Sequence, residues 1–283
     1  MKQLSIAAGL ALSVASGNVL AADLANTKAP PVVAPVAHNW TGLYGGVNVG
    51  YGFGANNYGY GGTMTAPLAN VATYGYGVNK TISAGVIGGG GIGYNRQLNS
   101  FLVLGFEADI QASDINGASA DVVGANTANA VMSSQNYFSL DWYGTARGRV
   151  GVSVPGYTNF LVYGTGGFAY GYVNNTYSRA YLASNPVGQG ASGVSTIGNT
   201  QTGWTAGGGI EWSPQTFPAW SAKVEYLYTD LGTATQNYYS TYSTAGLYNF
   251  SGYRATPTAF NTVRVGLNWH FNPLEGQAIV AKY

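Results

Sequence analysis

Residues Trp220–Asp230 read WSAKVEYLYTD, and along this stretch apolar and polar side chains alternate. The even-numbered positions are apolar or aromatic, whereas the odd-numbered positions are mostly polar and include Lys223 and Glu225. A period of two is typical of a β-strand rather than a helix. The 11 residues match the length that a tilted strand needs to cross a bilayer. The stretch therefore fits either a soluble sheet or a membrane barrel with lipid outside and charges inside.

The composition bears on the choice between a soluble sheet and a membrane barrel. Charged residues make up only 7% of the 283 residues, against about 25% in a typical soluble domain. The formal net charge of +1 argues against nucleic acid as a partner. The absence of cysteine excludes disulfides, thiol nucleophiles and thiolate metal sites. No run of about 20 apolar residues follows the N-terminus, so we expect no helical membrane span.

The chain divides into four predicted parts. A basic start, an apolar run and small residues near Ala22 predict a signal peptide over residues 1–21. Prolines then favour an extended periplasmic linker over residues 22–39. We expect the barrel to span residues 40–271 and a periplasmic C-terminal tail to span residues 272–283.

Candidate strands recur from Trp40 onward, and the connections between them alternate between two lengths. The strands are expected at about 42–53, 85–98, 101–110, 140–152, 159–172, 203–213, 220–230 and 259–271. The short connections lie near 99–100, 155–158 and 214–219; the other four span about 25–30 residues. This alternation predicts an all-β fold: an eight-stranded antiparallel up-and-down transmembrane β-barrel with short periplasmic turns and four long, structureless extracellular loops. A soluble β-sandwich is the alternative.

The tryptophans fall at the ends of the expected strands rather than in their middles. Aromatic residues gather at the two membrane–water boundaries of such barrels. The expected belt residues are Trp40, Trp142, Trp204, Trp212, Trp220 and Trp269.

Charged residues on the expected strands share the inward face and balance in sign. The predicted interior network comprises Glu107, Asp109, Arg147, Arg149, Glu211, Lys223, Glu225 and Arg264. Buried charges are tolerated when they are paired and hydrogen-bonded. Since the interior of an eight-stranded barrel is only wide enough for side chains, we expect a plugged lumen.

Several stretches resemble a known family. They are Trp40–Gly46, Phe101–Asp109, Tyr143–Gly151, Leu161–Gly171, Lys223–Tyr228 and Asn261–Leu267. Together they resemble the RopB-type outer-membrane β-barrel proteins of alphaproteobacteria, some of which are described as porin-like and some as binding haem. The resemblance implies a barrel in the outer membrane, surrounded by lipid and lipopolysaccharide and inserted by the barrel-assembly machinery. It also implies that Phe271 is the aromatic assembly signal of the last strand, although this chain continues for 12 residues beyond it.

The sequence motifs that would indicate a catalytic or cofactor-binding site are weak. Gly88–Gly93 formally matches a dinucleotide fingerprint, but no helix follows to receive a pyrophosphate. The chain contains two histidines, His38 in the linker and His270 at the periplasmic end. We therefore expect no enzyme activity, cofactor or metal.

The sequence predicts a surface protein with a structural role in the envelope. A small porin is one alternative, and a surface receptor or adhesin is another. The receptor or adhesin would use tyrosines in the long loops to bind haem or a host partner. Haem is the more concrete ligand, because tyrosine can ligate haem iron. These tyrosines are Tyr58, Tyr60, Tyr74, Tyr76, Tyr238, Tyr239, Tyr242 and Tyr248.

Overall fold

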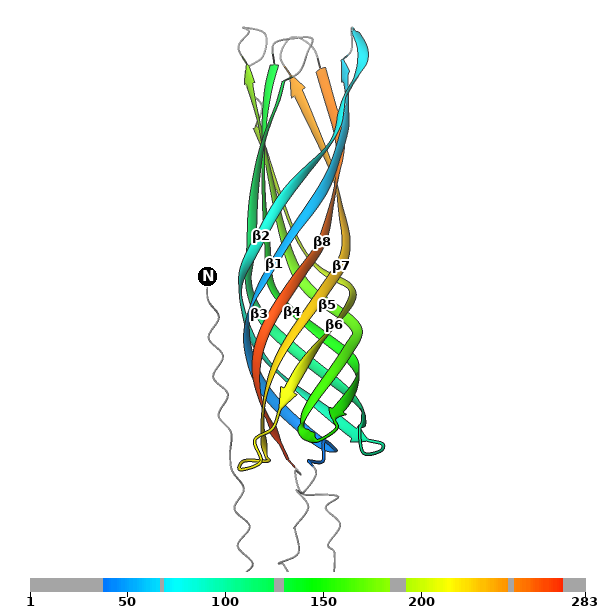
Figure 1. The fold of residues 1–283 in the computed structure, drawn as a ribbon. Helices are drawn as coiled ribbons and strands as arrows, with labels where there is room; N and C mark the ends of the chain where they lie inside the picture. The colour runs from blue at the N-terminus through cyan, green and yellow to red at the C-terminus, as the bar shows by residue number, and fades with distance from the viewer. Residues whose placement is uncertain (1–37, 67–68, 125–129, 184–191, 244–246, 272–283) are drawn as a thin grey trace, which may run out of the picture. The chain divides into compact units, whose positions relative to one another are not determined.

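The computed structural model describes residues 38–66, 69–124, 130–183, 192–243 and 247–271, which form eight β-strands (Figure 1). The strands are β1 (Gly42–Ala66), β2 (Ala69–Gln97), β3 (Leu102–Gly124), β4 (Ala130–Val154), β5 (Tyr157–Ala183), β6 (Ser192–Trp212), β7 (Trp220–Ser243) and β8 (Leu247–His270). Each strand pairs antiparallel with its neighbours in sequence, and β8 pairs with β1 to close a barrel. The predicted fold class is confirmed. The described residues contain no helix that is both long and apolar enough to cross a membrane.

Short turns join β2 to β3, β4 to β5 and β6 to β7 at one end of the barrel, which we call the short-turn end (Figure 1). They lie where the sequence predicts them. The β4–β5 turn contains Gly156 with φ of 82°, a left-handed conformation that glycine adopts without strain. The opposite end, which we call the hairpin end, is where β1 passes into β2, β3 into β4, β5 into β6 and β7 into β8.

The prediction of four structureless loops at the hairpin end is wrong. The strands continue well beyond the expected limits of Phe53, Ile110, Tyr172 and Asp230, and neighbouring strands stay paired there. The register of β1 with β2, for example, runs from Gly42 to Ala66. The sequence of these extensions is rich in Gly, Asn, Ser, Thr and Tyr and shows little alternation of apolar and polar residues, so the pattern does not mark them as strands.

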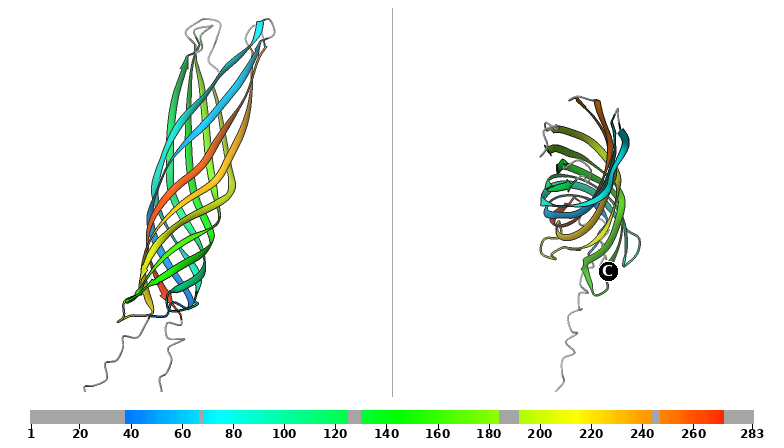
Figure 2. Two further views of the ribbon diagram at one scale, coloured as in Figure 1. Left: turned by 45° about the vertical axis from the view of Figure 1, so that its right-hand side comes forward. Right: turned by 90° about the horizontal axis from the view of Figure 1, so that it is seen from above.

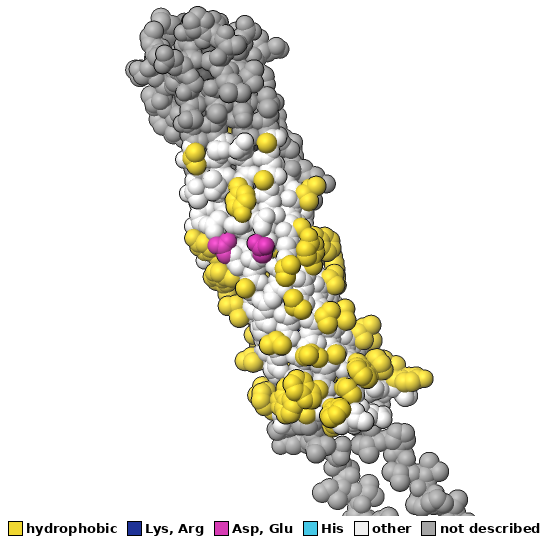
Figure 3. All heavy atoms as spheres, turned by 90° about the vertical axis from the view of Figure 1, so that its left-hand side faces the viewer, with side chains coloured by type: hydrophobic (Ala, Val, Ile, Leu, Met, Phe, Trp, Pro, Cys, Tyr) yellow, Lys and Arg dark blue, Asp and Glu magenta, His cyan; other side chains and the backbone are white. Residues whose placement is uncertain are grey.

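Period-two alternation places one face of each strand outside and the other inside. On β7, Val224 is 54% exposed whereas its neighbour Glu225 is 1% exposed. Figure 3 shows hydrophobic side chains over the outer wall of the described region, with few charged side chains, of acidic type, on that face. An apolar outer wall is what a bilayer-spanning barrel requires.

The barrel closes through β1 and β8, whose pairs run from Tyr44↔His270 upward. The strands tilt and coil around the barrel (Figure 2). Beyond the last pair, the Phe271 N–H donates to the carbonyl of Leu43 over 2.9 Å. The Phe271 ring itself is 55% exposed on the outer wall.

Candidate functional site

The eight charged residues of the expected network all lie inside the barrel, each with 7% exposure or less. The strand register places them beside one another: Glu107 pairs with Arg147, Glu211 with Lys223, and Glu225 with Arg264. Four carboxylates and four basic groups therefore meet in one layer. Salt bridges of 2.8–3.0 Å link the acids of β3 to bases on β4, β7 and β8.

Arg147 contacts three of the four carboxylates in this layer. Its guanidinium donates to Glu107 Oε1 and Asp109 Oδ2, each over 2.8 Å, and to Glu225 Oε1 over 3.0 Å. Arg264 contacts two of the same acids, with 2.6 Å from its Nε to Glu225 Oε2 and 3.0 Å to Asp109 Oδ2. The planar guanidinium offers five donors in a fixed fork, which explains why arginines fill these positions.

Two tyrosines join the network, and sequence reasoning did not assign them to it. The Tyr44 hydroxyl donates to Glu107 Oε2 over 2.8 Å and accepts from Arg149. The Tyr163 hydroxyl donates to Glu225, and the Arg149 guanidinium carbon lies 3.7 Å from the centroid of the Tyr163 ring. The alternation of β1 already places Tyr44 on the inward face, so that signal was present.

A hydrophobic layer inside the barrel lies on the hairpin side of the charges, and the sequence analysis missed it. Its buried members are Ile87, Ile115, Phe138, Leu140, Tyr143, Ala169, Val173, Leu231 and Phe260. The ring centroids of Tyr143 and Phe260 lie 5.2 Å apart in an edge-to-face contact. The lumen is thus filled by two unlike layers, one ionic and one apolar.

The assignment of Trp40 to an aromatic belt is wrong, because Trp40 is fully buried inside the short-turn end. It packs with Val103, Leu161 and Tyr163. Its indole N–H donates to the Thr158 carbonyl over 3.0 Å, so the polar edge of the ring is satisfied only in this inward position.

The packed structure also begins before the expected linker boundary at Trp40. The backbone N–H of His38 donates to Thr158 Oγ1, and the His38 ring lies 4.5 Å from the Trp40 ring. Burial, and secondly His270, whose ring centroid is 6.5 Å away, lower the pKa of His38 to about 4 against the opposing effect of Glu211.

The other tryptophans lie outward, near the ends of the wall. Trp212, Trp220 and Trp269 are 42–44% exposed, and the rings of the last two are 4.8 Å apart. Trp204 is 51% exposed on the hairpin side and contacts Tyr228, while half-buried Trp142 contacts Tyr170.

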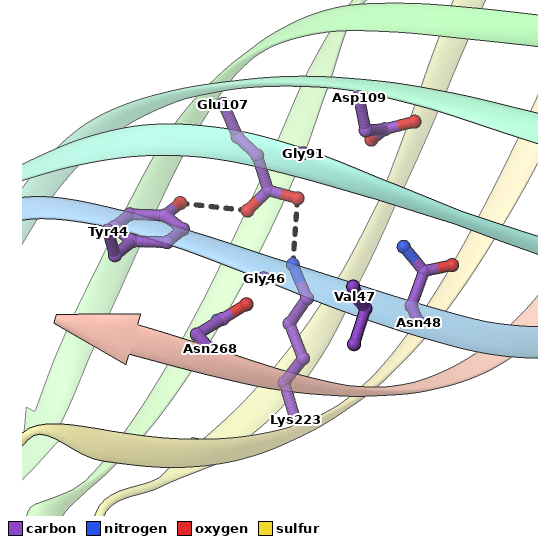
Figure 4. A pocket seen from close by; sticks show the side chains of 9 residues that line it. All are labelled: Tyr44, Gly46, Val47, Asn48, Gly91, Glu107, Asp109, Lys223 and Asn268. Carbon is purple, nitrogen blue, oxygen red and sulfur yellow. Dashed lines mark hydrogen bonds and ion pairs between the residues drawn. The ribbon is translucent and has the colours of Figure 1, made fainter.

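A small hollow lies beside the charged layer (Figure 4). Tyr44, Glu107, Lys223 and Asn268 point into it, and Gly46 contributes backbone only. The space is on the order of one water molecule. A solute path would need a continuous opening, which this hollow does not provide.

Other expectations concern residues beyond this description. The signal peptide, most of the linker and the C-terminal tail lie outside the described residues, as do the side chains of the eight loop tyrosines. Within the described part of the chain, no group of three or more His, Asp or Glu side chains could hold a metal ion.

Comparison with known proteins places the chain among outer-membrane proteins. No family model matches it. The chain is 32% identical over 270 residues to the 31 kDa outer-membrane immunogenic proteins of Brucella melitensis and Brucella suis, covering 94% of this chain and 97% of each relative.

Two solved structures are more distant. The outer membrane protein OprG of Pseudomonas aeruginosa is 12% identical, over 83% of this chain and 98% of that one, with a TM-score of 0.35. Neisserial surface protein A is 12% identical, over 82% and 98%, with a TM-score of 0.27. Scores this low add nothing to the argument from the Brucella relatives. On that sequence identity, the chain belongs to the alphaproteobacterial outer-membrane β-barrel family of the 31 kDa outer-membrane immunogenic proteins, and its location is the outer membrane.

Proposed function

We propose that the protein is a closed surface anchor: a plugged barrel that holds long paired hairpins outside the cell and contributes mechanical integrity to the envelope. The observation that carries this proposal is the double filling of the lumen. The ionic layer around Arg147 and the apolar layer around Phe260 block the same passage at two levels. The word immunogenic in the names of the Brucella relatives supports exposure of the hairpin end outside the cell.

Conductance in planar bilayers tests this proposal directly. Purified protein is inserted, and its folded state is verified by a faster-migrating unboiled band on an SDS gel. We expect no unitary current steps across a wide range of voltages, because neither layer leaves a continuous aqueous path. Reproducible steps from the folded wild-type protein would overturn the closed anchor and favour the small porin.

Enzyme activity is not part of the proposed function. Ser221, His270 and Glu211 form a hydrogen-bonded cluster at the short-turn end, and these residue types also form catalytic triads. The Ser221 hydroxyl lies 2.9 Å from His270 Nε2, and Glu211 is also nearest to that same nitrogen, at 3.6 Å. A catalytic triad needs the serine and the carboxylate on opposite ring nitrogens. The cluster instead supports a structural role, because all three side chains are 5% exposed or less.

We propose further that the barrel-assembly machinery recognises Phe271, which is exposed on the outer wall next to the β1–β8 closure. Phe271→Ala is expected to lower the fraction of heat-modifiable, folded protein in cells. Leu267→Ala is the matched control, because Leu267 of β8 is 53% exposed and lies four residues before Phe271. Equal losses from both substitutions would remove the special role of Phe271.

A further inference from the structure

The barrel wall does not stay closed along its full height. Among the described residues, pairing of β6 with β7 ends at Trp204↔Asp230, and pairing of β2 with β3 ends at Ala84↔Asn116. The other neighbouring strands remain paired well beyond these levels. The hairpin end therefore consists of two four-stranded sheets, β7–β8–β1–β2 and β3–β4–β5–β6. The left view of Figure 2 shows them as two separate arms.

An aspartate in an irregular stretch faces a glycine near both separations. It lies at the last pair of β6 with β7 and just before the last pair of β2 with β3, beyond which Thr81 Oγ1 still donates to Ser119 Oγ over 3.1 Å. The register of β7 with β8 shifts between Asp230 and Thr233, where Gly232 has φ of 82° and donates its N–H to Asp230 Oδ1. A β-carbon on Gly203 of β6 would collide with the carbonyl oxygen of Asp230. On the other side, Gly85 faces the Asp114 carbonyl in the same way. The bulges bend the strands apart at fixed positions.

The β6 edge that results carries no protection against pairing. Natural edge strands are usually blunted by charge, proline or a covering element. Residues 192–203 of β6 contain no charged residue and no proline. Val194 is 72% exposed and Ile197 is 38% exposed. By contrast, the sequences of the β2 and β3 edges include Lys80 and Asp121.

Hydrogen-bonding groups along this separation are also unused. Gln201 of β6 is 7% exposed, and neither its amide nitrogen nor its amide oxygen has a partner. Gln236 of β7 is equally buried, and its Nε2 has no partner. The separation of β6 from β7 thus leaves side-chain amides without protein partners beside the unpaired backbone.

We propose that the free edge of β6, residues 192–203, binds an extended, uncharged segment of another polypeptide by adding it as an antiparallel strand. The edge offers backbone donors and acceptors at strand spacing, which only another extended backbone matches along its length. Because the edge carries no charged partner, an uncharged segment meets it without leaving a charge unpaired at the contact. A second copy is a poorer match for this edge: two β6 strands in one membrane point the same way and would pair parallel, the less stable arrangement.

The test uses an uncharged peptide copied from residues 233–243 of β7, carrying a fluorophore and added to the full-length protein in bicelles. Binding is followed by anisotropy. We expect saturable binding that is at least about tenfold weaker for the double substitution Ile197→Lys with Asn199→Lys, because lysine on an edge opposes strand addition. Tyr137→Lys is the control, since exposed Tyr137 lies on β4 within the sheet rather than at its edge. A peptide carrying two central prolines should not bind.

Cross-linking locates the bound strand, because the chain has no cysteine of its own. Asn199→Cys should form a disulfide with cysteine-labelled peptide, at a peptide position that moves in the antiparallel sense when the cysteine moves to Ile197. Tyr137→Cys should not. The proposal is overturned if the peptide does not bind, or if the edge double variant binds it as well as the Tyr137→Lys control does. It is also overturned if Asn199→Cys forms disulfides only between two copies of the protein.

Discussion

The two halves of β6 differ in how their backbone is satisfied. Residues 204–212 pair with β5 on one side and β7 on the other, whereas residues 192–203 pair only with β5. The change occurs at Trp204, an outward tryptophan near the limit of the apolar wall. Lipid offers no hydrogen bonds, so a strand inside the bilayer must be paired on both edges. Water relaxes that demand, so an unpaired edge beyond the apolar wall costs much less than one facing lipid.

The largest effect is expected from the ionic layer in the closed half. Arg147→Ala leaves Glu107, Asp109 and Glu225 without their shared partner and should lower the free energy of unfolding by about 3–5 kcal/mol. Urea titration in lipid vesicles, followed by tryptophan fluorescence, measures it. Arg147→Lys should recover part of the loss. A loss below about 1 kcal/mol for the alanine variant would contradict a tightly coupled network.

The second-largest effect is expected from a charge added to the outer surface, which should distinguish the closed half of the barrel from the open half. Val224→Arg places a cation toward lipid and should cost about 2–4 kcal/mol if Val224 lies near the bilayer midplane. Thr235→Arg makes the same addition on the exposed surface of β7 in the open half and should change stability by no more than about 0.5 kcal/mol. Similar costs at both positions in a vesicle folding titration would place the membrane boundary elsewhere.

The boundary itself can be tested with glycines. Gly203→Ala forces its methyl group against the Asp230 carbonyl and should cost about 1–3 kcal/mol. Gly148→Ala on β4 adds the same methyl group where the nearest atom is 3.9 Å away, so we expect little change. Thermal midpoints of the folded gel band compare the two variants. An inert Gly203→Ala would show that the separation of β6 and β7 does not depend on this contact.

The smallest expected effect lies at the short-turn end and depends on pH. The folded-state pKa of His38 is about 4, below the unfolded value of about 6.5. The unfolded chain therefore binds the proton first, and stability present above pH 6.5 is lost as the pH falls toward 4. We expect a loss of about 1 kcal/mol at pH 5.5 relative to His38→Phe, measured by urea titration of both proteins. Parallel pH profiles would show that His38 is not the group responsible.

Alternation predicted the wall because the bilayer imposes it. The inward and outward faces of β7 follow from the sequence of Trp220–Asp230 alone. Leu140 departs from this alternation. Counting by two from Trp142 places Leu140 on the outer face, yet it is buried inside the barrel. The register of β4 with β5 shifts between these residues, so the strand changes phase. A one-residue shift moves every later side chain to the other face, and no composition signal marks it.

The interior shows a second limit. Phe260 lies on the inward face of β8 by simple alternation, but other members of its layer, among them Ile115 and Leu231, lay beyond the expected strand limits. Trp40 was misplaced for a different reason. Its burial depends on Thr158, which is 118 residues away in sequence, and local pattern cannot show such a contact.

That distance has a consequence for the order of folding. Trp40 lies near the start of the packed chain, yet its site is assembled from the β4–β5 turn and from His270 at the end of β8. Contacts between residues so far apart in sequence form late, because the intervening chain must first be ordered. Until β8 has joined β1, Trp40 has no complete site to enter. Burial of Trp40 therefore requires that the first and last strands have already met, so it reports completion of the ring.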